Sequence, residues 1–281
     1  MFSLRAGRPI AKTDSKKSTV LSIIDEDSKK MEELCCSEHD SEECEDEPCC
    51  NYCQTYYESS SDSEDNFTIY KSKEELIPLA DLTSRFVEFI AGPSGSGKST
   101  MAATLADKFK KIYPKKPIYI FSRTDAKNDP AFIHLKPIQI AIDESLIEDP
   151  IDITQEVTEE GCLLIFDDCA TIHNDKIRKE VEKLIADAME VGRKLNCNMI
   201  VTSHLVIPNE KKFARTILNE LTILTVFPKS GSSQQIRYAL KQYFGLSNKQ
   251  IDQILALKSR WVRISKTFPQ YVLYDHGAYI L

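Results

Sequence analysis

The residues from Phe86 to Thr100 read F-V-E-F-I-A-G-P-S-G-S-G-K-S-T, and they determine the fold class that we expect. A short apolar run ends at Ala91 and is followed at once by a complete G-x-x-x-x-G-K-[ST] motif. Residues 102–111 then have the composition of a helix. An apolar strand, a glycine loop and a helix in this order are typical of a phosphate-binding loop, because glycine lets backbone N–H groups turn toward phosphate oxygens.

This loop predicts a site for a nucleoside triphosphate with Mg²⁺. The Lys98 ammonium can reach the β- and γ-phosphates, and the Ser99 hydroxyl can ligate Mg²⁺. A glycine-rich turn that binds nothing is the weaker alternative, because every motif position and both flanks match. The residues expected to hold the nucleotide are Gly92, Pro93, Ser94, Gly95, Ser96, Gly97, Lys98, Ser99 and Thr100.

A second apolar run ends in two carboxylates, at residues 162–168, which read C-L-L-I-F-D-D. Such a run is usually only a strand followed by a turn, but about 70 residues after a phosphate loop it indicates the other half of a nucleotide site. We expect Asp167 to hold Mg²⁺ through water or Ser99. Asp168 is then placed to orient or deprotonate the attacking water.

A long helix over residues 174–193 is followed by a buried strand that ends in T-S-H at residues 202–204. Polar residues at such a strand end can sense the γ-phosphate, so Thr202, Ser203 and His204 are candidates, with His204 preferred. The alternative is an ordinary capped strand end.

Strands alternate with helices from residue 86 to residue 227, which predicts an α/β fold of the P-loop NTPase class. We expect a RecA-like parallel sheet with helices on both faces, in an ATPase core over residues 76–230. Residues 231–281 read as two helices and a hairpin, a small α+β extension packed on this core. We expect a half-buried edge hairpin, although the aromatic residues beside Arg260 and Arg263 also suit contact with nucleic acid.

The charge of the chain is concentrated at its beginning. Residues 1–70 hold 7 Lys or Arg and 17 Asp or Glu, with few large apolar residues, so we expect a disordered acidic tail. Zn²⁺ binding in this tail is a weaker alternative than free thiols, because two adjacent Cys-Cys pairs do not make two spaced ligand pairs. The tail cysteines are Cys35, Cys36, Cys44, Cys49, Cys50 and Cys53.

No run of about 18 apolar residues is present, so we expect no membrane span. The beginning of the chain is basic but has no apolar core of the kind found in secretory signals. We therefore expect a reducing intracellular compartment.

The order of the motifs resembles that of the poxvirus-type DNA-packaging ATPases of large DNA viruses, within the FtsK/HerA-like P-loop ATPases. The resemblance covers residues 86–227, half of the chain, and it rests on G-P-S-G-S-G-K-S-T, L-L-I-F-D-D-C, G-R-K-L-N-C-N-M-I-V-T-S-H and A-R-T-I-L-N-E. It implies a ring-forming motor that hydrolyses ATP to move double-stranded DNA, in the host cytoplasm or the virion, with capsid or other virion proteins as further partners.

The same resemblance implies that Arg193 is an arginine finger reaching a neighbour's γ-phosphate. A cation at a helix C-terminus, favoured by the helix dipole, is the alternative for Arg193. His204 departs from the glutamine common in the bacterial translocases.

Two other classes of function remain open from the residues alone. A GTPase requires the guanine-binding motif N-K-x-D, whereas residues 248–252 read N-K-Q-I-D, which is one residue too long. A nucleotide kinase requires a lid segment with arginines, and the sequence has no clear segment of this kind. An ATP-binding assembly or scaffold protein is the third class, and the intact Asp167 and Asp168 argue against it.

Overall fold

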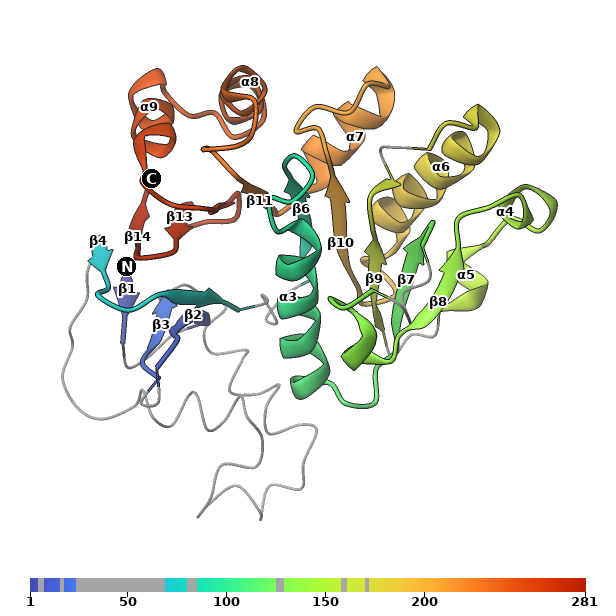
Figure 1. The fold of residues 1–281 in the computed structure, drawn as a ribbon, viewed down its shortest axis with the longest axis horizontal. Coiled ribbons are helices and arrows are strands. Elements are labelled where there is room, and N and C mark those ends of the chain that lie inside the picture. The colour runs from blue at the N-terminus through green and yellow to red at the C-terminus, as the bar shows by residue number, and fades with distance from the viewer. Residues whose placement is uncertain are drawn as a thin grey trace, which may run out of the picture.

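A ten-stranded mixed β-sheet forms the centre of the protein (Figure 1). The computed structural model describes residues 1–4, 8–15, 18–23, 69–79, 85–124, 129–157, 161–169 and 172–281. In spatial order the strands are β4 (Ile69–Lys71), β14 (Gly277–Ile280), β13 (Tyr271–Tyr274), β12 (Val262–Ser265), β11 (Ile223–Val226), β6 (Val87–Ala91), β10 (Cys197–Ser203), β9 (Cys162–Phe166), β7 (Ile118–Ser122) and β8 (Ile138–Ala141).

The strands from β11 to β8 are parallel, which confirms the expected RecA-like sheet. Strands β6 and β9 are buried along their whole length, as continuous apolar runs in a parallel sheet should be. Strand β10 lies between them, so one additional strand separates the phosphate loop from the two carboxylates. All three strands run in the same direction, and their C-terminal ends therefore meet at one edge of the sheet.

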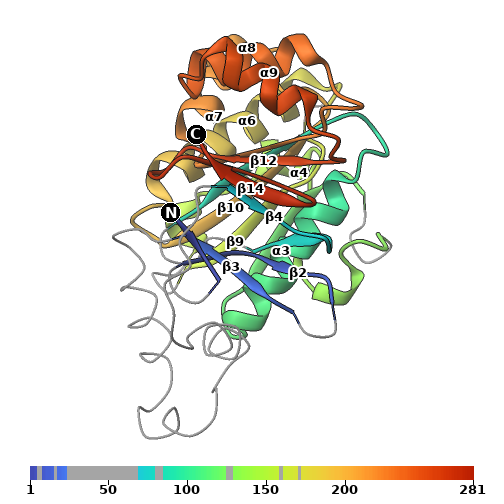
Figure 2. The same ribbon diagram turned by 90° about the vertical axis from the view of Figure 1, so that its left-hand side faces the viewer.

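Helices cover both faces of the sheet, as predicted (Figure 2). Helix α3 packs on one face, and α6 to α9 lie along the other. Helix α6 starts where predicted because the Asn174 side chain accepts hydrogen bonds from the first turn. The helices are α3 (Lys98–Ile112), α4 (Ser145–Glu148), α5 (Ile153–Glu156), α6 (Asp175–Val191), α7 (Lys211–Glu220), α8 (Ser233–Tyr243) and α9 (Asn248–Ala256), with a 3-10 turn at Ile133–Leu135.

The expectation of disorder is wrong for the beginning of the chain. A separate four-stranded antiparallel sheet there has the order β1-β3-β2-β5. Its apolar side chains, including Phe2 and Ile23, join the same buried cluster as Leu105 and Phe109 of α3. The average composition of residues 1–70 conceals these short segments, which are stabilised by packing on distant residues. The strands are β1 (Phe2–Ser3), β2 (Arg8–Thr13), β3 (Val20–Ile23) and β5 (Leu76–Pro78).

The predicted C-terminal hairpin is present as β12 and β13, which pair antiparallel, but it does not lie at the edge of the sheet. Strand β12 pairs antiparallel with β11, so the core sheet continues through β12, β13 and β14 to β4 at its edge. Arg263 on β12 is 1% exposed, and this burial excludes it from contact with nucleic acid. The two predicted helices of this region are present as α8 and α9.

The remaining part of the expected acidic tail, residues 24–68, lies outside the described residues, and it includes all the tail cysteines named above. Cys162, Cys169 and Cys197 are buried free thiols. Within the described ranges, none of the helices has the length and apolar character needed to span a bilayer.

Candidate nucleotide-binding and hydrolysis site

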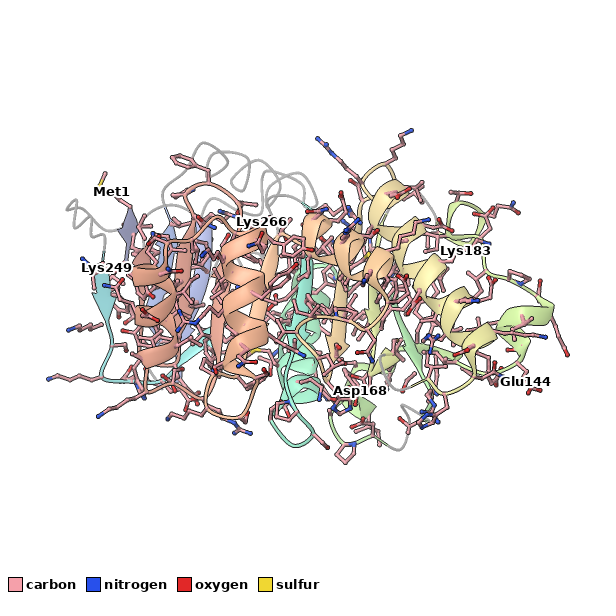
Figure 3. The ribbon with its side chains drawn as sticks, turned by 90° about the horizontal axis from the view of Figure 1, so that it is seen from above. Met1, Glu144, Asp168, Lys183, Lys249 and Lys266 are labelled. Atoms are coloured by element: carbon pink, nitrogen blue, oxygen red, sulfur yellow. The ribbon has the colours of Figure 1, made fainter. Side chains whose placement is uncertain are left out.

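The phosphate loop joins the end of β6 to the start of α3, at the edge of the sheet where Asp168 is labelled in Figure 3. Gly95 and Gly97 have φ angles of 74° and 108°, a left-handed region that glycine adopts without strain. Helix α3 begins at Lys98, and among the described residues no side chain caps its N-terminus. Its first N–H groups are therefore available to donate hydrogen bonds to an anion.

The walls of the loop fit a phosphate group. The Ser96 hydroxyl oxygen is buried and has no hydrogen-bond partner among the described residues. A buried polar atom without a partner costs free energy, and a phosphate oxygen would relieve that cost. On the other side of the loop, a Cβ atom on Gly92 would lie 2.6 Å from Cδ2 of Phe227, so the loop can pack this closely on Phe227 only with glycine there.

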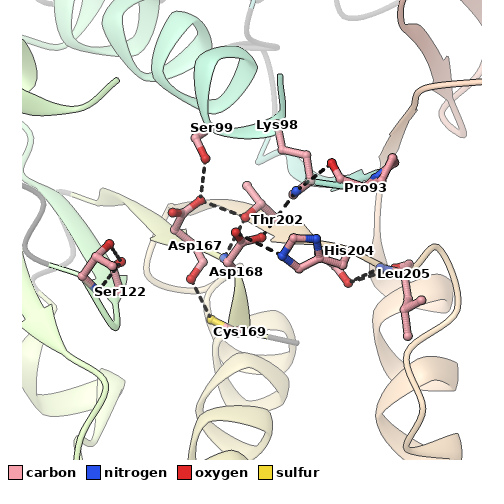
Figure 4. Close-up of polar contacts among 12 residues, drawn as sticks. Pro93, Lys98, Ser99, Ser122, Asp167, Asp168, Cys169, Thr202, His204 and Leu205 are labelled. Carbon is pink, nitrogen blue, oxygen red and sulfur yellow. Dashed lines mark hydrogen bonds and ion pairs between the residues drawn. The ribbon is translucent and has the colours of Figure 1, made fainter. Parts of the chain in front are cut away.

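Asp167 lies directly after β9 and faces the loop (Figure 4). Its Oδ1 accepts hydrogen bonds from Ser99 Oγ at 3.4 Å and from Thr202 Oγ1 at 2.9 Å. Burial raises the pKa of Asp167 above its ordinary value, while the hydrogen bond from Thr202 acts in the opposite direction. The expected contact between Ser99 and Asp167 is therefore present.

Asp168 occupies the centre of the remaining polar contacts (Figure 4). Its backbone has a φ of 50°, which is uncommon for a residue other than glycine and typical of functional sites. Its N–H donates to Thr202 Oγ1 at 2.8 Å. Lys98 Nζ lies 3.6 Å from its Oδ1, and His204 Nε2 lies 3.3 Å from its Oδ2. The carboxylate is 38% exposed, so water can reach it.

The described residues contain no group of three or more His, Cys, Asp or Glu side chains that could hold a metal ion. Ser99 and Asp167 nevertheless offer a hydroxyl and a carboxylate oxygen on facing elements. Mg²⁺ prefers oxygen ligands and usually completes its shell with water and substrate phosphates. The pair thus fits a magnesium ion that arrives with a nucleotide.

Arg193 lies away from the other predicted site residues. It is exposed in the turn between α6 and β10, at the start of a seven-residue strand whose other end is beside the loop. A strand of this length separates the two edges of the sheet by roughly 20 Å. Asp168 and Lys266 mark these opposite edges in Figure 3. Arg193 therefore cannot reach the site of its own chain, and a role toward a neighbour stays a prediction.

The turn that carries Arg193 is held by Arg85. The Arg85 guanidinium donates to the carbonyl oxygens of Ala188, Met189 and Cys197 at 2.7, 2.9 and 2.8 Å. These bonds satisfy the C-terminal carbonyls of α6 and tie them to the first residue of β10. The backbone around Arg193 is thus fixed even though its side chain is exposed.

Sequence reasoning missed two residues that border the loop, Phe227 and Arg260. A Cβ atom on Gly97 would lie 3.2 Å from Nη2 of Arg260 and 3.8 Å from Cε1 of Phe227. Phe227 follows β11, which neighbours β6, so the rule that parallel strands end at one edge could have identified it. Arg260 precedes an antiparallel strand, and no local pattern indicates its position. Thr202 was only a candidate sensor, whereas its hydroxyl contacts both carboxylate residues.

Comparison with known sequences gives a clear relative. No protein-family profile matches the chain. A protein of the Sputnik virophage, named Uncharacterized protein V3, is 40% identical over 225 residues, which cover 80% of this chain and 89% of V3. The chain belongs to the V3 family. Its V3-like region is long enough to include the phosphate loop and most of the sheet, because only 56 residues of the chain lie outside an alignment of that length.

Solved structures similar to this V3-family chain include ATPases of viruses and bacteria. The genome-packaging NTPase B204 of Sulfolobus turreted icosahedral virus 2, in complex with ATP-gammaS, is 14% identical, with 70% of this chain and 98% of that chain covered and a TM-score of 0.44. EssC (ATPases 2 and 3) of Geobacillus thermodenitrificans is 16% identical, with 75% and 43% covered and a TM-score of 0.47. These likenesses are weak, and the fold assignment rests on the strand order and the loop themselves.

Proposed function

We propose that the chain is a P-loop ATPase that moves double-stranded DNA during viral genome packaging, as a ring-shaped homo-oligomer. The proposed ATP hydrolysis is supported by one observation. Four side chains lie together at one edge of the sheet, namely those of Lys98, Ser99, Asp167 and Asp168. Binding a triphosphate requires only the loop, whereas hydrolysis also requires a position for the metal and one for the attacking water. The two carboxylates supply both.

Each residue of the site has one task in this proposal. The loop N–H groups and Lys98 hold the phosphates. Ser99 and Asp167 hold Mg²⁺, which neutralises charge on the phosphate oxygens when it is bound. Asp168 orients the attacking water and accepts its proton at a carboxylate oxygen. His204 lies against that carboxylate at 3.3 Å, where it can fix the carboxylate's direction and respond to the γ-phosphate.

The parts of the proposal that concern DNA and the ring have their own support. The chain has a virophage relative, and its motif order resembles that of the packaging ATPases named above. Arg193 is exposed at the edge of the sheet opposite its own site, so a finger role requires a second subunit. An assembly of this kind would work in the host cytoplasm or the virion, next to capsid proteins.

The test is ATP hydrolysis by the full chain with Mg²⁺, with and without double-stranded DNA, alongside the mass of the assembled state. We expect hydrolysis that double-stranded DNA stimulates and a ring-sized particle in MgATP. A monomer that hydrolyses ATP at the same rate with and without DNA would contradict the DNA-moving role, and only the ATPase activity would remain supported. Nucleotide binding without turnover would instead support an assembly or scaffold protein.

Subunit mixing tests the role of Arg193. Lys98→Ala removes a subunit's own site, and Arg193→Ala removes only what that subunit gives to its neighbour. Each variant alone should be inactive, whereas a mixture should recover part of the activity, because some interfaces combine an intact site with an intact Arg193. A mixture that stays inactive while both variants assemble normally would contradict a finger that acts between subunits.

A further inference from the structure

Arg260 is a cation beside the phosphate loop that no task in the proposed hydrolysis uses. Its guanidinium is so close to Gly97 that a Cβ atom there would lie 3.2 Å from Nη2 and 3.7 Å from Cζ. Gly97 is the last loop residue before α3. The guanidinium therefore lies beside the first free N–H groups of the helix, the groups that a phosphate would contact.

The backbone of Arg260 is fixed by its surroundings, although its side chain is exposed. The Arg260 N–H donates to Asp275 Oδ2 at 3.1 Å. The residues on either side, Ser259 and Trp261, are 0% and 6% exposed. Ser259 Oγ donates to the Trp261 carbonyl at 2.5 Å and accepts from the Asp275 N–H at 3.3 Å. This short junction between α9 and β12 holds Arg260 at the edge of the sheet where the loop lies.

Arg260 differs from Arg263, three residues later, in how its charge is balanced. The Arg263 guanidinium is buried and paired with Glu88 at 2.8 Å. The described residues provide no carboxylate within ion-pair distance of the Arg260 guanidinium. An arginine that packs against a phosphate loop without an anionic partner is suited to an anionic ligand.

We propose that Arg260 binds the phosphate chain of the nucleotide in the same subunit, from the side of the loop opposite Asp167 and Asp168. This role depends on the nucleotide site proposed above. The carboxylates approach from β9 and Arg260 from the start of β12, with β6 and its loop between them. A triphosphate in the loop would therefore have Lys98 on the carboxylate side and Arg260 on the other. The C-terminal region would thus complete the nucleotide site of its own chain.

The test is the dissociation constant of the full chain for two probes, MgATP and inorganic tripolyphosphate, measured by calorimetry. Arg260→Ala should weaken both by about tenfold, equivalent to about 1.4 kcal/mol. Arg260→Lys should recover part of the loss, because the charge returns without the planar fork. Lys249→Ala is the matched control, since Lys249 is an exposed cation of the same region that lies far from Asp168 in Figure 3, and it should bind like the wild type.

Two results would overturn the role of Arg260. One is wild-type affinity of Arg260→Ala for both probes. The other is a loss for MgATP but none for tripolyphosphate, which would place the contact at the base or ribose. If instead the wild type binds no MgATP, or Lys98→Ala binds it equally well, the nucleotide site itself is wrong and both proposals fall. Thermal unfolding of each variant shows whether the fold is intact, and the exposed Arg260 side chain should be replaceable without a change.

Discussion

Two charged clusters, one centred on Glu88 of the phosphate-loop strand β6 and the other beside the loop that follows this strand, differ in how completely their groups are paired. The closed cluster consists of Glu88, Thr225, Arg263 and the Leu79 carbonyl. Glu88 and Arg263 are 0% and 1% exposed. Arg263 donates to Glu88 at 2.8 Å and to the Leu79 carbonyl at 2.9 Å, and Thr225 Oγ1 donates to Glu88 at 2.6 Å. These short bonds join β6, β11 and β12 to the segment that follows β5.

The open cluster consists of Lys98, Asp168 and His204, at the end of the same region of sheet. Its ionic contacts are longer, at 3.6 Å from Lys98 and 3.3 Å from His204, and Asp168 is partly exposed. The backbone of Asp168 is in a left-handed conformation, which the closed cluster does not require of any of its residues. Charges that are buried and fully bonded maintain a structure, whereas a partly exposed charge with long ionic contacts, such as Asp168, can exchange one partner for a ligand.

The largest effect is expected from breaking the closed cluster. Glu88→Ala leaves the Arg263 guanidinium buried without a counter-charge, and should lower the free energy of unfolding by about 3–5 kcal/mol. Denaturant titration of the variant measures this loss. The double variant Glu88→Leu with Arg263→Met should recover most of it, because an apolar pair carries no charge to desolvate. Equal stability of Glu88→Ala and the wild type would contradict the structural role.

Breaking the open cluster should affect turnover more than stability. Asp168→Asn removes the group that accepts the proton of the attacking water, and should lower the rate of ATP hydrolysis by about a hundredfold or more. The unfolding free energy should change much less than in Glu88→Ala, because Asp168 is 38% exposed and its contacts with Lys98 and His204 are long, although Lys98 itself is 5% exposed. Phosphate release and denaturant titration of the same preparation give both values. A large loss of stability with normal turnover would reverse the roles of the two clusters.

A smaller loss of stability is expected when only the Thr225 hydroxyl is removed from the closed cluster. Thr225→Val keeps the size of the side chain but removes the hydroxyl that donates to Glu88. Hydrogen bonds to charged groups contribute about 1.5–3 kcal/mol, so unfolding should become easier by about 1.5 kcal/mol. Thr104→Val is the control, because the Thr104 hydroxyl bonds a helix carbonyl at an exposed position. The two variants should differ clearly in denaturant titration, and equal losses would argue against a special role for Thr225.

The smallest effect concerns the charge of Asp167. Burial raises its pKa in the folded chain, so its ionisation makes the folded state less stable as pH rises through that pKa. In the absence of nucleotide, Asp167→Asn should therefore melt at a slightly higher temperature than the wild type at neutral pH. The difference should vanish at acidic pH, where both side chains are neutral. A variant that melts lower than the wild type throughout would contradict the cost of this buried charge.

The open cluster could be predicted from the sequence and the closed cluster could not, for a physical reason. Asp168 and His204 come at the ends of apolar strands, and Lys98 comes at the end of the glycine loop that follows another. Parallel strands bring such ends to one edge whatever the rest of the chain does. Glu88 and Arg263 are 175 residues apart, and each lies inside an apolar strand where a charged residue gives no hint of its partner. The strands of the first 23 residues were missed for a similar reason, because Phe2 and Ile23 gain their burial from α3 and β13, far away in the sequence.

The measurement that tests the central claim most directly is phosphate release from MgATP by the full wild-type chain and by Lys98→Ala under the same conditions. The two-cluster account predicts turnover by the wild type and none by Lys98→Ala, with both proteins unfolding at the same denaturant concentration. Absence of turnover in the wild type, or equal turnover in the two proteins, would contradict the assignment of the open cluster as the site of hydrolysis.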